Sequence, residues 1–317
     1  MQVIKDRYGR TFRTLRVSLL NQCNLGCVYC VDPAEGRTVR GQHPLLSVTA
    51  LLEIIDRLHR RLGLDTIRLT GGEPLLYRDL VELVQGVRTL GIPHIKLTTN
   101  GSLLERLAMP LKEAGMESIN VSLDAMDEGV FFRMSRRHSA ERIIRGIDAA
   151  RAAGLEVKIN AVMMKGINDS QILPLLDFAA SRGIRIRFLE VMAMGHLQDK
   201  SAQYLLSQEE ILKIIGRQYR FGPLGRAGSA TARYWQVEEG PVFGIIANES
   251  EPFCGDCDRL RLDSNGNIYG CLSSNHPISL VGGDSDAGWG MKLQQALEQK
   301  QTLRFTGSDL SMLDIGG

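Results

Sequence analysis

Short β-branched runs alternate with amphipathic runs of helical spacing from residue 14 to about residue 190. In one helical run the apolar residues stand at Leu51, Ile55, Leu58 and Leu62, and a glycine follows each such run. The runs with strand character are 15–20, 66–70, 94–100, 118–124, 157–163 and 184–191. Six strand–helix units predict a parallel α/β array, which is either a barrel or an open doubly wound sheet.

The two faces of these predicted strands differ in polarity, and the difference separates the two architectures. One face is apolar, as at Leu15 and Val17, and suits packing against helices. The other face is polar and cationic, and it carries Arg16, Ser18, Arg68, Thr70, Lys96, Thr98, Asn120, Ser122, Lys158, Asn160, Arg185 and Arg187. A doubly wound sheet needs two apolar faces, and a closed eight-stranded barrel fills its interior with aliphatic side chains. We therefore predict an incomplete (βα)6 TIM-like barrel with a polar lumen. The alternative, a sheet with one face in water, is rare among parallel sheets.

The segment QCNLGCVYC follows the first predicted strand and contains Cys23, Cys27 and Cys30 at C-x3-C-x2-C spacing. Barrels of this kind place their chemistry at the carboxyl ends of the strands, so the triplet belongs at the rim of the lumen. Zinc normally takes C-x2-C pairs and a fourth protein ligand. A cubane iron–sulfur cluster held by three cysteines instead leaves one iron open to an exogenous ligand. The spacing therefore favours an iron–sulfur site over zinc.

The motif LTGGEPLL, residues 69–76, follows the second predicted strand and lies on the same rim. Glycine lets the backbone come close to a ligand, and a carboxylate can receive a charged amino group. Gly72 and Glu73 are therefore candidate ligand-binding residues, and an ordinary strand–turn is the alternative interpretation.

A second cysteine triplet, spaced C-x2-C-x13-C, consists of Cys254, Cys257 and Cys271. A zinc ribbon would need a second cysteine pair, and only one cysteine follows the first pair. Arg259 and Arg261 alternate with Leu260, so on a strand both guanidinium groups would face one side; a solvated edge strand is the alternative. The six cysteines form two triplets with none left over, which favours two metal sites over three disulfides.

Composition excludes several classes of protein. The 317 residues carry a net charge of +2, so nothing indicates a general nucleic-acid or membrane-surface binder. The N-terminal segment lacks the continuous apolar core of a secretory signal, and no stretch approaches the ~20 apolar residues of a membrane helix. We expect a cytoplasmic protein without nucleic-acid or membrane partners.

Three features together resemble a known family. They are the first triplet with Tyr29 before its last cysteine, the second triplet with RLR inside it, and the terminal Gly316-Gly317. The first feature resembles the signature of radical S-adenosylmethionine enzymes, in which the open iron binds that cosubstrate. All three resemble the GTP 3′,8-cyclase family, which catalyses the first step of molybdenum cofactor biosynthesis. The resemblance implies two 4Fe-4S clusters, S-adenosylmethionine, a radical barrel at 1–195 and an auxiliary-cluster region at 196–317 that closes the barrel opening.

The resemblance also implies roles for individual residues, with the two triplets holding the two clusters. The cosubstrate would be bound by Tyr29, Gly72, Glu73, Ser122 and Met192. The substrate would be bound by Arg16, Arg68, Thr98, Lys158, Arg187, Arg259, Leu260 and Arg261. The residues with a catalytic role would be Cys23, Cys27, Cys30, Arg259, Arg261, Gly316 and Gly317.

The implied reaction cyclises GTP to (8S)-3′,8-cyclo-7,8-dihydroguanosine 5′-triphosphate. A 5′-deoxyadenosyl radical takes the hydrogen from C3′, and the ribose radical attacks C8 of the guanine. A flavodoxin- or ferredoxin-type protein would donate electrons, cyclic pyranopterin monophosphate synthase would act on the product, and a homodimer is compatible with the resemblance. A triphosphate carries about four negative charges, which guanidinium groups in the lumen would match.

Three segments depart from the family pattern: 20–22 (Leu-Asn-Gln), 196–206 and 273–280. None removes a cysteine. They leave open a paralogous radical S-adenosylmethionine enzyme that acts on a different small molecule or on a peptide. A protein of another class, a zinc-stabilised binding protein, would use both triplets structurally.

Overall fold

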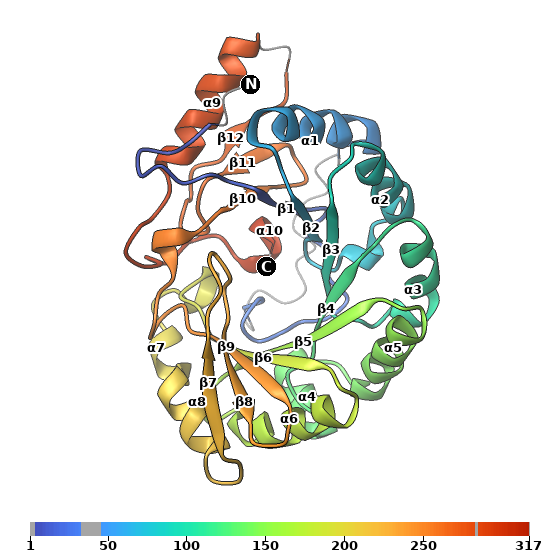
Figure 1. Cartoon of the computed structure of the whole chain (residues 1–317), viewed down its shortest axis with the longest axis vertical. Coiled ribbons are helices and arrows are strands. Elements are labelled where there is room, and N and C mark those ends of the chain that lie inside the picture. The colour runs from blue at the N-terminus through green and yellow to red at the C-terminus, as the bar shows by residue number, and fades with distance from the viewer. Residues whose placement is uncertain (1–3, 33–45, 283–284, 317) are drawn as a thin grey trace.

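The structure is a computed structural model that describes residues 4–32, 46–282 and 285–316 (Figure 1). Its N-terminal strands are β1 (Thr14–Ser18), β2 (Thr66–Thr70), β3 (His94–Thr99), β4 (Ser118–Ser122), β5 (Glu156–Met163) and β6 (Arg185–Glu190). Its later strands are β7 (Phe221–Gly225), β8 (Arg233–Val237), β9 (Val242–Ile246), β10 (Arg259–Leu262), β11 (Asn267–Tyr269) and β12 (Ile278–Ser279). Its α-helices are α1 (Val48–Leu62), α2 (Leu80–Thr89), α3 (Leu104–Glu113), α4 (Glu128–Ser135), α5 (Ala140–Ala152), α6 (Ile172–Ser181), α7 (Ser201–Tyr204), α8 (Gln208–Ile215), α9 (Asp286–Glu298) and α10 (Met312–Ile315).

The strands of the described residues form one twelve-stranded sheet, in the order β12-β11-β10-β1-β2-β3-β4-β5-β6-β9-β8-β7. Strands β1 to β6 pair in parallel with their sequence neighbours, as the strand–helix pattern predicts. Figure 1 shows the sheet curved into an open ring, with α1 to α6 around its outside and α10 inside it. The predicted incomplete barrel is therefore confirmed.

The C-terminal region extends both edges of this barrel. Strand β10 pairs in parallel with β1, and β9 pairs in parallel with β6. The outermost strands, β12 and β7, are the two ends of the sheet order, so the ring stays open as a hydrogen-bonded sheet. The region after residue 195 thus flanks the opening with strands and places α10 in the lumen (Figure 1).

Helix packing explains the apolar face of the strands. Leu15, Val17 and Ile67 are completely buried in the core between the sheet and its helices. Helix α1 begins after Ser47, whose side chain accepts a hydrogen bond from the Ala50 backbone, and its buried stripe packs on this face. The polar face of each strand must then point into the lumen, because successive side chains alternate.

Strand register aligns the lumen cations. Arg261 on β10 pairs with Arg16 on β1, and Arg16 pairs with Arg68 on β2. Arg68 in turn pairs with Lys96 on β3. We call Arg261, Arg16, Arg68 and Lys96 the cation row. Four adjacent parallel strands therefore present positive side chains at one level of the lumen.

In the part of the chain that the structure describes, none of the helices combines the length and the apolar character needed to cross a membrane.

Candidate active site

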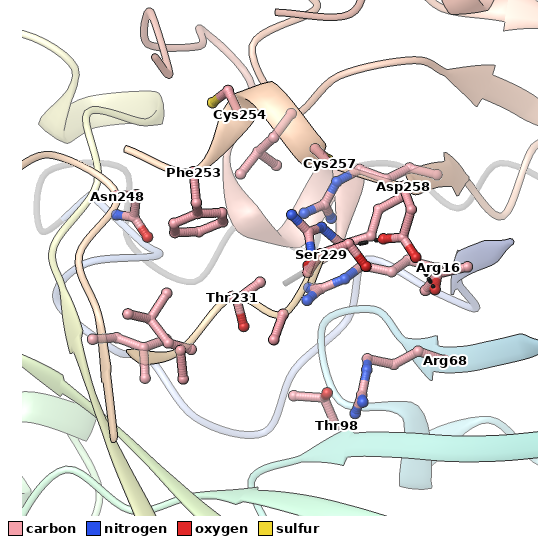
Figure 2. Close-up of a pocket in the computed structure, with 18 of the residues that line it drawn as sticks. Arg16, Arg68, Thr98, Ser229, Thr231, Asn248, Phe253, Cys254, Cys257 and Asp258 are labelled. Carbon is pink, nitrogen blue, oxygen red and sulfur yellow. Dashed lines mark hydrogen bonds and ion pairs between the residues drawn. The ribbon is translucent and has the colours of Figure 1, made fainter. Parts of the chain in front are cut away.

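A cavity of about 430 Å³ lies in the lumen and brings both halves of the chain together (Figure 2). Figure 2 shows Arg16, Arg68 and Thr98 on one side of it and Asn248 and Phe253 on the other. The sequence-predicted site residues that line it are Arg16, Arg68, Thr98, Arg187, Met192, Cys254, Cys257, Arg259, Arg261 and Cys271. Its size is in the range of small-molecule sites.

The cavity wall is strongly cationic. Burial and the charges of Arg261 and Arg68 lower the pKa of Arg16 well below its usual value. Burial, together with nearby Arg187, lowers the pKa of Arg68 to about 10, and burial likewise lowers the pKa of Arg261 to about 10. These arginines therefore repel one another in a poorly solvated space, and a bound anion would relieve that repulsion.

Several of these guanidinium groups have donor atoms without a partner. They are Arg16 Nε, Arg68 Nη1, and Arg187 Nε and Nη2, all buried. An unpaired buried donor is costly, so a cluster of them on one cavity wall indicates that a ligand or solvent supplies the acceptors. The donors therefore fit a polyanion with several oxygen atoms, such as a triphosphate.

The second triplet forms another part of the cavity wall. Burial and the neighbouring Cys271 raise the pKa of Cys254 to about 11. Although burial opposes it, the charges of Lys300 and Arg259 lower the pKa of Cys257 to about 7. The two cations therefore favour the thiolate form of Cys257, which is the form that binds a metal.

The first triplet lies in different surroundings. Burial raises the pKa of Cys27 well above its usual value, and Cys30 and Asp124 add to the shift. Burial, with Cys23 and Asp124, also raises the pKa of Cys30. Ionising these crowded thiols needs a compensating positive centre, which the irons of a cluster would provide.

Hydrogen bonds from the rim of the barrel hold the first-triplet loop. Asn100 Nδ2 donates to Asn24 Oδ1 at 2.7 Å and lies 3.8 Å from Cys23 Sγ. The Tyr29 hydroxyl donates to Asp124 Oδ2 at 2.8 Å, and burial raises the pKa of that carboxyl to about 6. Gly26 N donates to the Ser135 carbonyl at 2.9 Å. The predicted cosubstrate residue Tyr29 therefore also anchors the loop.

Gly71 and Gly72, the glycine pair of the motif LTGGEPLL, pack on the backbone that precedes the first triplet. A Cβ atom on Gly72 would lie 2.2 Å from the Gln22 carbonyl oxygen. Gly72 N donates to the Leu20 carbonyl at 2.7 Å, and Glu73 N donates to the Gln22 carbonyl at 2.8 Å. The close approach that the structure shows is to the cysteine loop, and contact of Gly72 with a ligand stays a prediction.

Glu73 is completely buried, and its carboxylate has intramolecular partners. It accepts hydrogen bonds from Thr99 Oγ1 at 2.5 Å, Asn100 N at 2.7 Å and Leu75 N at 2.9 Å. Burial nevertheless raises its pKa to about 7. The carboxylate thus holds the rim loops together, and its contact with a cosubstrate stays a prediction.

Some other predicted residues lie outside the cavity wall. Lys158 faces the lumen, but its Nζ pairs with Glu156 Oε1 at 2.8 Å. The Leu260 side chain is completely buried in the hydrophobic core, because it alternates with Arg259 and Arg261. Ser122 is partly buried at the end of β4. Further residues outside the cavity lining are Gly72, Glu73, Tyr29 and the first triplet, Cys23, Cys27 and Cys30.

The C-terminal tail enters the lumen through α10. Arg261 Nη1 donates to the Gly316 carbonyl, and Met312 lines the cavity. A Cβ on Gly316 would lie 2.8 Å from Thr70 Cγ2 and 3.0 Å from Ser18 Cβ, at a φ of +76° that already favours glycine. The prediction for Gly317 falls outside the described residues.

Residues of the three segments that depart from the family pattern hold loops outside the cavity wall. The Gln22 carbonyl accepts a hydrogen bond from Glu73 N. His196 Nε2 lies 3.0 Å from the Val28 carbonyl of the cysteine loop. Asn275 Nδ2 donates to Asp309 Oδ2 at 2.6 Å and so anchors the tail. No described residue of 20–22, 196–206 or 273–280 lines the cavity.

Sequence reasoning assigned no role to several residues of the wall. Asn120 and Asn160 lie on the predicted polar strand face, so strand alternation was an available signal for them. Thr231, Asn248, Phe253 and Lys300 come from loops and helix ends, where no periodic pattern marks them. Within the described ranges, no three His, Cys, Asp or Glu side chains are grouped closely enough to hold a single metal ion.

Comparison with family models divides the chain into two parts. Residues 17–179 match the radical SAM superfamily, and residues 184–304 match the family described as Molybdenum Cofactor Synthesis C. The curated "GTP 3′,8-cyclase" of Corynebacterium glutamicum is 40% identical over 286 residues, which is 86% of this chain and 76% of the relative. The "GTP 3′,8-cyclase" of Synechocystis is 38% identical over 316 residues, which is 100% of this chain and 95% of the relative.

Solved structures with similar folds are more distant in sequence. Streptococcus suis SuiB bound to S-adenosylmethionine has a TM-score of 0.61 at 17% identity, covering 84% of this chain and 62% of that chain. The structure titled "Native anSMEcpe with bound AdoMet" has a TM-score of 0.57 at 14% identity, covering 84% of this chain and 77% of that chain. At this identity the likeness supports the fold alone.

Proposed function

The chain belongs to the GTP 3′,8-cyclase family within the radical S-adenosylmethionine superfamily, and we propose that its lumen cavity is where GTP is bound and cyclised. It is a radical S-adenosylmethionine enzyme of the first step of molybdenum cofactor biosynthesis, forming (8S)-3′,8-cyclo-7,8-dihydroguanosine 5′-triphosphate. One observation carries the proposal of the site: a single cavity contains both unpaired buried guanidinium donors and the three thiols of the second triplet.

The cation row and Arg187 would bind the triphosphate. A triphosphate offers about four negative charges, and guanidinium forks match phosphate oxygens. The donors of Arg16, Arg68 and Arg187 that lack partners would find acceptors there. Binding would also relieve the mutual repulsion of the arginines, which adds to affinity.

The two triplets would hold the two 4Fe-4S clusters. All six cysteines are free, as this requires. Cys254, Cys257 and Cys271 would place their cluster beside the guanine end of the substrate. When bound at the first triplet, the cluster and S-adenosylmethionine supply the 5′-deoxyadenosyl radical that removes the C3′ hydrogen of GTP.

The protein's contribution to the reaction is positioning and exclusion of water. The arginines fix one end of the nucleotide and the second triplet fixes the other, which places C3′ in one orientation. Arg261 holds the Gly316 carbonyl, so α10 fills the lumen where a side chain on residue 316 would collide with β1 and β2. The tail thus limits solvent access to the reacting ribose.

The electron donor and the downstream enzyme are proposed from the same family membership. A flavodoxin- or ferredoxin-type donor would supply electrons, and cyclic pyranopterin monophosphate synthase would use the product. The six free cysteines suit a reducing cytoplasm. We keep the division into a radical barrel at 1–195 and an auxiliary-cluster region at 196–317, and homodimerisation is to be measured by light scattering.

The direct test is anaerobic incubation of the reconstituted protein with GTP, S-adenosylmethionine and dithionite, followed by mass analysis. We expect the cyclised nucleotide, and none when S-adenosylmethionine is omitted or ATP replaces GTP. Absence of this product from protein that contains about eight irons per chain would refute the proposal.

A paralogue acting on another substrate would keep both triplets without needing the cation row. Equilibrium binding of GTP to the reconstituted protein separates the two functions. Micromolar affinity supports the proposal, and the absence of the three departing segments from the described cavity lining favours that outcome.

A further inference from the structure

Lys300 is a buried lysine beside the second triplet. Lys300 comes two residues after the end of α9, and it is 6% exposed. Nζ donates to Cys257 Sγ at 3.3 Å and to the Arg259 carbonyl at 2.8 Å. It also lies 5.1 Å from the centre of the Phe12 ring.

These contacts leave one group that can neutralise the ammonium. A buried charge is costly unless it is paired. In the described part of the chain, the ion pairs of the structure include no carboxylate bound to Lys300; the carbonyl and the aromatic ring are neutral. Among these contacts, the Cys257 sulfur 3.3 Å away is the one group that would carry negative charge, because an iron ligand binds as the thiolate.

We propose that Lys300 is a positioning residue of the second triplet, whose hydrogen bond to Cys257 makes the cluster bound there easier to reduce. The inference rests on the proposed binding of a cluster at this triplet. Hydrogen bonds to cluster sulfurs and nearby charge set the reduction potential of iron–sulfur centres. Reduction adds one electron, supplied by dithionite in the assay, and the ammonium stabilises the added negative charge.

The same contact connects the second triplet to the part of the cavity wall that would bind the substrate. Lys300 joins the Cys257 sulfur to the backbone of Arg259, and Arg259 donates from Nη1 to the Ser229 carbonyl at 2.7 Å. A cluster ligand and a substrate-binding arginine therefore share one buried cation.

The first triplet provides an internal reference. Its sulfur contacts come from neutral groups: Leu25 N donates to Cys23 Sγ at 3.4 Å, and Asn100 Nδ2 lies 3.8 Å from the same sulfur. Changing Lys300 should leave the potential of the first cluster unaltered.

The test is a dithionite titration of the reconstituted full chain, followed by electron paramagnetic resonance and with iron counted in each sample. Lys300→Met removes the charge at similar length, Lys300→Arg keeps it, and Lys112→Met is the control. Lys112 is an exposed lysine whose Nζ donates to the Gly154 carbonyl at 2.8 Å. Full chains in which serines replace the first triplet assign the signal of the second cluster.

At the wild-type midpoint, we expect Lys300→Met to lower the reduced-to-oxidised ratio of the second cluster about tenfold, which is roughly 59 mV for one electron. Lys300→Arg should restore most of the ratio, and the control should match wild type. An unchanged ratio in Lys300→Met at full iron content would overturn the inference. So would loss of the second cluster in both Lys300 variants, because the role would then be structural. If the wild-type protein holds only about four irons, the proposed function fails first, and iron content alone shows it.

Discussion

The two cysteine triplets share a count of three thiols but differ in their surroundings. The first lies beside the carboxyls of Asp124 and Glu73, and Cys27 and Cys30 have raised pKa values. The second forms part of an open cavity wall beside cations, and the pKa of Cys257 falls to about 7. Residue spacing alone predicts a cluster at each triplet, whereas only the structure shows that the charges around the two triplets differ.

Those charges suit separate tasks for the two clusters. The carboxyls of Asp124 and Glu73 would disfavour an extra electron on the first cluster, although Arg137 also contacts its loop at the Asn24 carbonyl. Cationic surroundings favour anions at the second, which is where we propose that GTP binds. The predictions below test this contrast in order of decreasing effect.

Removing one cysteine from each triplet should separate the two tasks. We expect Cys27→Ser and Cys257→Ser each to lose about half of the roughly eight irons and to lower cyclised product at least about 1000-fold. Only Cys27→Ser should also abolish cleavage of S-adenosylmethionine, measured as 5′-deoxyadenosine. Equal loss of cleavage in both variants would contradict the division of tasks.

Replacing a cation-row arginine should weaken binding and stabilise the free protein. In Arg68→Met the loss of a charge-assisted contact of about 2 kcal/mol should raise the Kd for GTP about 30-fold. The Tm without ligand should rise, since burial and nearby Arg187 already lower the pKa of Arg68 to about 10. Calorimetry measures both quantities.

Arg60→Met is the matched control for this experiment. Arg60 lies on α1 and pairs with Asp56 at 2.7 Å on the outer surface. Neither Kd nor Tm should change much. A fall in Tm with unchanged Kd for Arg68→Met would show that the row stabilises the fold and does not bind substrate.

Filling the space at Gly316 should slow turnover. In Gly316→Ala the new Cβ would meet Thr70 Cγ2 at 2.8 Å, so α10 must move and release Arg261. We expect about a tenfold loss of turnover, equal to about 1.4 kcal/mol. Gly91→Ala is the control, because Gly91 has a similar φ of +78° and open space around its Cβ position. Equal losses of turnover in Gly316→Ala and Gly91→Ala would mean that backbone strain alone causes the effect.

The smallest effect is expected at Lys158. Its ammonium must leave Glu156, 2.8 Å away, before it can reach a phosphate. Lys158→Met should therefore raise the Kd for GTP only about threefold, well below the effect at Arg68. A change as large as that of Arg68→Met would mean that the ion pair opens freely in the complex.

Strand alternation predicted much of the fold and part of the site. The strand at 66–70 is β2 with the same bounds, and the other five expected runs correspond to β1 and β3 to β6 within about two residues at each end. Because side chains along a strand alternate with a period of two, the pattern predicted Arg16, Arg68 and Thr98 on the lumen face, and all three line the cavity. Local periodicity was sufficient here because each strand and helix is formed by contiguous sequence.

The features of the site that the sequence did not predict depend on contacts between segments that are distant in the sequence. Lys300 meets Cys257 across 43 positions, and Arg10 Nη1 donates to the Cys254 carbonyl at 2.8 Å across 244 positions. Glu73 matched a ligand motif, yet its carboxylate is used by Thr99 and Asn100 of the next strand. Such pairings leave no local pattern, since strand pairing and loop packing bring together side chains that are distant in the sequence.

The contrast between the triplets is tested most directly by the order in which the two clusters take up an electron. The measurement is a dithionite titration of the unmodified, reconstituted chain without S-adenosylmethionine or GTP, with both clusters followed by electron paramagnetic resonance. We predict that the second cluster is reduced at the higher potential, by at least roughly 59 mV or tenfold in the ratio of reduced to oxidised form. Reduction of the first cluster at an equal or higher potential would contradict the account.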